Sequence, residues 1–212
     1  MGAYAQVKDM VAASALLEAP LEPLFRGWSL EALAGRYVEI SGGTATAALT
    51  VCAGLVLQAQ RRGAFAAWIG GYSSSFYPPD FAEAGIDLKA LPVVRVAEPA
   101  EGWRAADTLL RSGAFAIVVI DLGCKARLPL AAQTRLAGLA KKHNTALLVI
   151  TRQPRRGGQG GPNGSLASLR GETDKRRVER DCFACEVRVV KDKRRPPGWG
   201  HEEMCRGPDG LC

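Results

Sequence analysis

The chain has 212 residues, of which 47% are hydrophobic and 23% charged, and its formal net charge is +7. These values are typical of a soluble globular protein with one sizeable core. The sequence contains no apolar run that is long enough to cross a bilayer, and its first ten residues lack the order of a signal peptide. Its six cysteines are scattered along the chain. We therefore expect reduced thiols, a cytoplasmic location and no membrane partner.

The first elements are short. Apolar residues at helical spacing predict a helix over 7–17, which Pro20 and Pro23 end. Ser29 is expected to cap a second short turn. We therefore divide the chain into an N-terminal helical extension over 1–34, a core over 35–195 and an irregular C-terminal tail over 196–212.

The core opens with a strand over 37–40, a glycine turn over 41–44 and a helix over 45–60. This order places a helix N-terminus at the end of a parallel strand, where phosphates bind. A P-loop needs a glycine, four residues and then Gly-Lys-Ser/Thr. Counted from Gly42, those three positions are Ala47, Ala48 and Leu49. We predict a degenerate nucleotide site with no cofactor and no catalytic residue. Its residues are Gly42, Gly43, Ala47, Ala48, Leu49 and Asp121.

Strand and helix patterns then alternate to residue 151. Strands are expected over 64–69, 91–96, 116–120 and 146–151, and helices over 80–84, 98–112 and 128–143. Asp121 follows the strand over 116–120, at the position where P-loop ATPases keep the acid that orients Mg²⁺. A helix cap or an ion pair is the alternative for this carboxylate. The pattern predicts an α/β fold with a mainly parallel sheet, flanked by helices, and a late strand over 183–190 at an antiparallel or mixed edge.

Positive charge is concentrated late in the chain. Residues 152–195 hold thirteen Lys and Arg against six Asp and Glu, so this segment carries the whole net charge of +7. The loop over 152–165 combines arginines, which pair with phosphates, and glycines, which allow close approach. We predict salt-sensitive binding of single-stranded DNA without base recognition; a solubilising segment is the alternative. The predicted DNA contacts are Arg152, Arg155, Arg156, Arg170, Lys175, Arg176 and Arg177.

The late cysteines raise the alternative of a zinc site. Cys182, Cys185, Cys205 and Cys212 lie near His201, but only the first pair has the usual tight spacing. Within a strand the thiols of that first pair would lie on opposite faces. We therefore predict no metal site.

Several segments resemble the core of the RecA recombinase. These are Gly35–Gly42 with the helix that follows, Leu109–Gly113 before the strand that ends in Asp121, His143–Leu148, and Glu186–Lys193. The resemblance implies a RecA-like fold and shows which functional positions differ. The P-loop residues are Ala47, Ala48 and Leu49, the position of the catalytic glutamate falls near Tyr72, and that of the γ-phosphate sensor falls at Thr151–Arg152.

With its small size and altered motifs, the chain resembles the ImuA family of RecA-like accessory proteins, which are also similar to the cell-division inhibitor SulA. This resemblance implies a non-catalytic adaptor in the SOS response, DNA repair and error-prone translesion synthesis. The implied partners are RecA, an ImuB-like protein and the error-prone polymerase complex. Two alternatives stay open. One is a SulA-like inhibitor that acts by protein contact, and the other is a weak DNA-stimulated ATPase that takes a lysine from elsewhere, such as Lys125.

Overall fold

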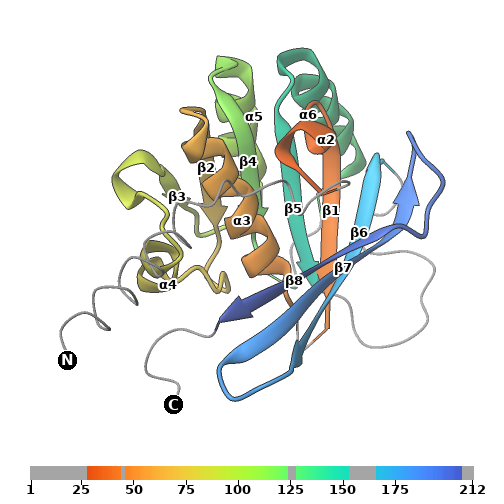
Figure 1. Cartoon of the computed structure of the whole chain (residues 1–212). Helices are drawn as coiled ribbons and strands as arrows, with labels where there is room; N and C mark the ends of the chain where they lie inside the picture. Colours follow the sequence, from red (N-terminus) through yellow and green to blue (C-terminus); the bar gives the residue numbers. More distant parts are fainter. Residues whose placement is uncertain (1–27, 44–45, 124–127, 153–165, 207–212) are drawn as a thin grey trace, which may run out of the picture.

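The computed structural model describes residues 28–43, 46–123, 128–152 and 166–206, which form one eight-stranded sheet with helices on both faces (Figure 1). The strands are β1 (Tyr37–Gly42), β2 (Phe65–Gly70), β3 (Val93–Arg95), β4 (Phe115–Asp121), β5 (Ala146–Arg152), β6 (Leu169–Arg177), β7 (Cys182–Asp192) and β8 (Gly200–Arg206). The helices are α2 (Leu30–Leu33), α3 (Ala48–Arg61), α4 (Pro78–Glu83), α5 (Pro99–Ser112) and α6 (Leu130–His143), with a 3₁₀ turn, η1, over Leu88–Ala90.

The strand order is β3-β2-β4-β5-β1-β6-β7-β8. From β3 to β6 all neighbouring strands pair in parallel, whereas β7 pairs antiparallel with both β6 and β8. The predicted α/β fold, with a mainly parallel sheet and a late antiparallel edge, is therefore confirmed. The described helices have at most 14 residues, and none of them is long and apolar enough to span a membrane.

Two apolar layers cover the sheet. Helix α3 packs on one face, where Leu55 and Val56 lie fully buried against β1, β2 and β4. Helices α5 and α6 pack together on the opposite face, as Figure 1 shows. Burial of β4 on both faces explains its continuous apolar sequence, because neither side of this central strand meets water.

Local signals set the helix ends. Helix α5 begins with a reciprocal capping box between Glu98 and Glu101 and ends at Gly113, whose φ of 69° suits a residue without a side chain. Ser29 caps α2 as expected, accepting a hydrogen bond from the Ala32 N–H at 3.3 Å. The helix predicted over 80–84 instead begins at Pro78, because proline suits a first helical position. The helix predicted over 7–17 lies outside the described residues.

Two strands were not predicted. β6 occupies a segment interpreted only as charged, and β8 occupies most of the tail over 196–212 that was expected to be irregular. β6 lacks a clear apolar alternation because small or polar residues, Gly171 and Thr173, fill its buried positions. In β8 the inward positions are His201, which is buried, and Glu203 and Cys205, which are half-buried. The prediction of an irregular tail was therefore wrong for 200–206.

A buried ion pair links β7, in the antiparallel part of the sheet, to the residue that precedes β1 in the parallel part. The Arg36 guanidinium lies 2.5 Å from the Asp192 carboxylate, and the two side chains are 3% and 0% exposed. Arg36 also donates to the Ser168 carbonyl at 2.8 Å, while the Trp199 indole N–H donates to Asp192 at 3.2 Å. The network thus joins the start of β1, the entry to β6 and the end of β7.

Candidate nucleotide turn and basic edge of the sheet

The carboxyl ends of the parallel strands bring several predicted site residues to one edge of the sheet. Gly42, at the end of β1, lies opposite Arg152 of β5 on one side and Thr173 of β6 on the other. At the end of β2, Gly70 lies opposite Asp121 of β4. Ligands of open α/β sheets bind at this edge. This edge therefore brings Gly42 beside Arg152 and Thr173, and Gly70 beside Asp121.

Two threonine hydroxyls fill the turn between β1 and α3. The Thr46 hydroxyl lies 2.9 Å from the Thr173 hydroxyl and accepts a hydrogen bond from the Ala48 N–H at 3.1 Å. A Cβ atom on Gly42 would lie 2.1 Å from the Thr46 hydroxyl oxygen, so only glycine fits there. The Thr46 hydroxyl thus occupies one of the N–H groups at the start of α3, the end of a helix at which anions bind.

The three altered P-loop positions do not fit a triphosphate as a P-loop does. Ala47 and Ala48 are buried in the core beneath α3, and Leu49 is half-buried. None of the three supplies a cation or a metal-binding hydroxyl. Gly43 is described and half-buried, whereas residues 44–45 lie outside the described part.

Restoring the P-loop should increase nucleotide affinity. In the variant A47G/A48K/L49T, a lysine at position 48 would form charge-assisted hydrogen bonds with phosphate, each worth about 1.5–3 kcal/mol, or roughly tenfold to a hundredfold in affinity. The measurement is a calorimetric titration with Mg-ATP. The control A47G/A48M/L49T has a similar bulk and no charge. Equal affinities in the two variants would show that the turn geometry, rather than the missing cation, limits binding.

Asp121 lies at the carboxyl end of β4, on the edge of the sheet where the sequence predicted it. It is the last residue of β4, is 5% exposed, and accepts a hydrogen bond from the Ser74 hydroxyl at 2.6 Å. The Ser74 oxygen in turn accepts the Phe76 N–H at 3.2 Å, which fixes the loop after β2. Tyr72, at the position of the family's catalytic glutamate, is 92% exposed. Asp121 and Ser74 thus form a small polar pair beside the turn.

The predicted DNA contacts differ in how far they are exposed. Arg176 and Arg177 lie exposed at the end of β6, and Arg176 is only loosely paired with Glu202 at 3.8 Å. Lys175 is half-buried, with its ammonium 4.3 Å from the centre of the Phe183 ring. Arg152 ends β5 at the same edge. The remaining loop arginines, Arg155 and Arg156, lie outside the described residues.

Arg170 does not fit its predicted role. Its side chain is 12% exposed, and its guanidinium lies 3.4 Å from the Glu39 carboxylate, whose side chain is fully buried. Burial raises the pKa of Glu39, and the nearby positive charge of Arg170 opposes that rise. Arg170 therefore compensates a buried carboxylate in the sheet, and we leave it out of the DNA-binding surface.

The contacts of Phe183 with the cations of β6 were not predicted from the sequence. The register pairs it with Arg177 across β6 and β7, and both Lys175 and Arg177 lie over its ring. A cation over an aromatic face is attracted by the ring quadrupole, by about 0.5–1 kcal/mol at exposed sites. The signal that would have located Phe183 is the β6–β7 hairpin, which requires β6 to be recognised as a strand.

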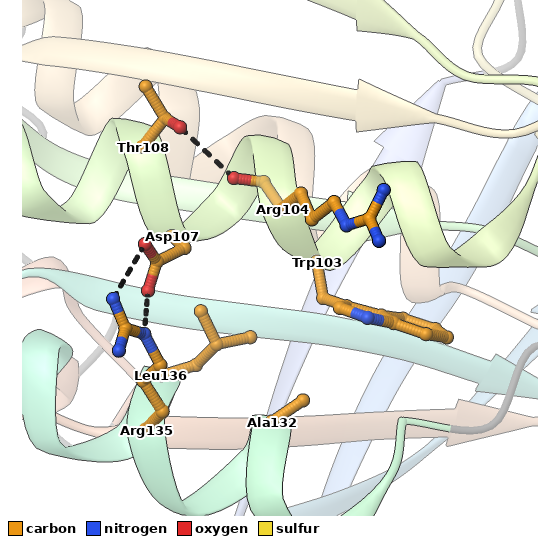
Figure 2. Close-up of a pocket in the computed structure, with 7 residues that line it drawn as sticks. All are labelled: Trp103, Arg104, Asp107, Thr108, Ala132, Arg135 and Leu136. Atoms are coloured by element: carbon orange, nitrogen blue, oxygen red, sulfur yellow. Dashed lines mark hydrogen bonds and ion pairs between the residues drawn. The ribbon is translucent and has the colours of Figure 1, made fainter.

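A separate hollow lies on the outer surface of α5 and α6 (Figure 2). It has a volume of about 310 Å³ and contains none of the predicted site residues. Asp107 and Arg135 face each other across it and form hydrogen bonds, while Trp103 lines one end. The hydrogen bonds from Arg135, with the positive charges of Arg135 and Arg111, lower the pKa of Asp107. The hollow is lined by α5 and α6 alone and is separate from the sheet edge that holds Gly42 and Asp121.

Three of the four late cysteines, Cys182, Cys185 and Cys205, lie on β7 and β8. Cys212 lies outside the described part of the chain, and within that part no group of three His, Cys, Asp or Glu side chains is arranged to hold a metal ion. Cys185 and Cys205 do approach each other, as described below.

Comparison with known proteins identifies similarity to RecA. No family model matches the chain. The RecA protein of Lactobacillus acidophilus is 32% identical over 136 residues, which cover 55% of this chain and 37% of that protein. The RecA protein of Leifsonia xyli is 30% identical over 200 residues, which cover 77% of this chain and 55% of that protein. The chain thus spans well under half the length of the Lactobacillus relative.

One prediction is corrected by these relatives. They are RecA proteins, and RecA is an ATPase, so the similarity points toward an ATPase-type enzyme family. The prediction that the chain is not an enzyme was therefore wrong. It relied on three residues of one turn, whereas the similarity extends over much of the core.

The fold and the relatives agree with each other. The mainly parallel sheet with its flanking helices is consistent with a RecA-like core. Over part of its length, and at identities of 28–39%, the chain is similar to RecA proteins, which supports its placement in a RecA-like family.

Proposed function

We propose that the chain is an ImuA-like member of this RecA-like group that acts in the cytoplasm during the SOS response. In this role it binds single-stranded DNA through the basic edge of its sheet and contacts RecA, an ImuB-like protein and the error-prone polymerase complex. The similarity to RecA supports the recombination and SOS context. The DNA-binding role and the partners are our inference from the edge and from the family resemblance.

The observation that carries the proposal is the position of the cations. The strand register places Arg152 beside Gly42, and β6 runs parallel to β1 and continues past it to Arg176 and Arg177. The segment over 152–195 holds the whole net charge of the chain. Arg176 and Arg177 are exposed at this edge, and cations gathered at one edge attract the phosphate backbone of a nucleic acid.

The same edge argues against base recognition. Arginine and lysine contacts to phosphate position a strand without reporting its sequence. Phe183 is half-buried and its ring is already covered by Lys175 and Arg177. Because base stacking needs an open aromatic face, we expect phosphate contacts to dominate binding.

The partner part of the proposal is tested by co-sedimentation. The purified chain is mixed with RecA filaments assembled on single-stranded DNA, and with the same DNA coated by an unrelated single-strand binding protein. We expect the chain to pellet with the RecA filaments at salt concentrations at which it no longer binds bare DNA. Sedimentation with neither sample, together with no recovery of RecA or an ImuB-like protein in a pull-down from DNA-damaged cells, would remove these partners.

A further inference from the structure

A groove of about 630 Å³ lies on the α3 face of the sheet. It is bounded by α3, α4, the outer part of β6 and the edge strand β8. Apolar side chains from the helices, Leu49 and Phe81 among them, form one wall, and Lys175, Glu203 and Cys205 form the other. Cys205 is half-buried and lines the groove.

A second thiol lies directly beneath this wall. Cys185 of β7 is fully buried, and the Cys205 thiol lies within hydrogen-bonding reach of its sulfur. The register pairs Cys185 with Glu203 and Cys205 with Phe183, so the two cysteines are diagonal neighbours on one face of adjacent antiparallel strands. The only other described cysteine on these strands is Cys182, which pairs with Arg206.

The surroundings distinguish the two sulfurs. The hydrogen bond from the Cys205 thiol, together with the positive charge of Lys175, lowers the pKa of Cys185. The hydrogen bond to Cys185, burial and the Glu203 carboxylate, which lies 3.6 Å from the Cys205 sulfur, raise the pKa of Cys205, so its proton leaves only when a base such as Glu203 accepts it. One sulfur is thus accessible beside a proton acceptor, and the other is shielded beside groups that favour its anion.

We propose that Cys185 and Cys205 form an oxidation site that a hydroperoxide converts to a disulfide between β7 and β8. This modification site is independent of DNA binding and of the partners proposed above. It requires two neighbouring thiols, one of them accessible, and the groove provides that access.

The reaction balances with one molecule of hydrogen peroxide. Cys205 passes its proton to Glu203, its sulfur attacks one peroxide oxygen, and the O–O bond breaks; the departing hydroxide recovers the proton as water. The Cys185 sulfur then attacks the sulfenic sulfur of Cys205, the S–S bond forms and the S–O bond breaks. The second hydroxide takes the Cys185 proton and leaves as water. Two sulfurs lose two electrons, which the peroxide oxygens gain.

Disulfide formation should move β8. Diagonal neighbours in an antiparallel pair lie about 7–8 Å apart between Cα atoms, slightly more than the usual disulfide span of about 4.4–6.8 Å. In the described sheet β8 is the edge strand and pairs only with β7, so it can move without breaking a second ladder. Because Cys205 lines the groove, the Cys185–Cys205 disulfide would draw the β8 side of the groove toward β7.

Peroxide treatment of the full-length chain tests the proposal. After the remaining thiols are alkylated, intact mass and a tryptic map are recorded. We expect the loss of two hydrogen atoms and a cross-link between the peptides that contain Cys185 and Cys205, reversed by a thiol reductant. Cys182 shares a tryptic peptide with Cys185, so C182S is the matched control and should form the cross-link to the same extent as the wild type.

Two further variants complete the test. The cross-link should disappear in C185S and in C205S; Cys205 is half-buried on an edge strand, so the second variant keeps the test valid if C185S does not fold. A cross-link that survives C205S, one that is lost in C182S, or conversion of Cys205 to a sulfinic acid without any cross-link would each overturn the proposal.

Discussion

Replacing Arg36 with Met should lower the free energy of unfolding by about 3–5 kcal/mol, because it leaves the Asp192 carboxylate buried without its partner. Both side chains are almost fully shielded from water, and Arg36 is the only cation bonded to Asp192 in the described structure. Urea denaturation at neutral pH, followed by tryptophan fluorescence, measures the change.

The Arg62–Glu31 pair provides the matched control. Its atoms are also 2.5 Å apart, but its side chains are 46% and 65% exposed. An exposed pair contributes about 0–1 kcal/mol, so R62M should be nearly neutral. An equal fall in the free energy of unfolding in R36M and R62M would contradict the claim that the Arg36 network stabilises the antiparallel edge.

The pH dependence of these variants has a definite sign. Burial acts to raise the pKa of Asp192, but hydrogen bonds from Arg36, the Arg194 N–H and Trp199, with the charge of Arg36, leave that pKa lowered. A lowered carboxyl pKa contributes stability above the unfolded value of about 3.9, and that stability is lost as the pH falls through the folded value. The difference between wild type and R36M should therefore shrink in acid. A difference that stays constant from neutral pH to pH values below the unfolded pKa would contradict this.

The second large effect is expected at the basic edge. Changing Arg152, Arg176 and Arg177 together to Ala should weaken binding of single-stranded DNA by about a hundredfold or more at low salt, because each lost charged hydrogen bond is worth about 1.5–3 kcal/mol. Fluorescence anisotropy with a labelled oligonucleotide measures the loss. The triple variant should also have a shallower salt dependence: the slope of log affinity against log salt concentration should fall in magnitude by about 0.7 for each lost phosphate contact.

A charge-matched control comes from the opposite edge. Arg111, Lys141 and Lys142 are exposed in the last turns of α5 and α6, which return the chain to the amino ends of the strands. The variant R111A/K141A/K142A removes the same charge and should bind DNA nearly as well as the wild type. If both triple variants lose affinity equally, net charge rather than the proposed edge controls binding.

The sequence predicted the parallel core well because its signals are local. The strand of 116–120 is apolar throughout, and Gly42 and Asp121 stand at strand ends, where parallel packing brings them to one edge. The caps at Ser29 and Gly113 likewise involve neighbouring residues only. Such features need no knowledge of the rest of the chain.

The sequence failed where distant residues decide the outcome. β6 is a strand because β1 and β7 pair with it, although its own buried positions include glycine and threonine. Arg170 was expected to contact DNA because it lies in a basic segment, yet its partner Glu39 is 131 residues away. Neither contact leaves a periodic pattern in the sequence. The enzyme prediction failed for a related reason, because it judged one turn without the relatives of the whole core.

The most direct test of the account is the binding of the wild-type chain to labelled single-stranded DNA across a salt series, followed by fluorescence anisotropy. We predict clear binding at low salt, with the logarithm of the affinity falling linearly with the logarithm of the salt concentration and little difference between oligonucleotide sequences. Absence of binding at low salt, or an affinity that does not change with salt, would contradict the claim that this RecA-like chain acts through the basic edge of its sheet.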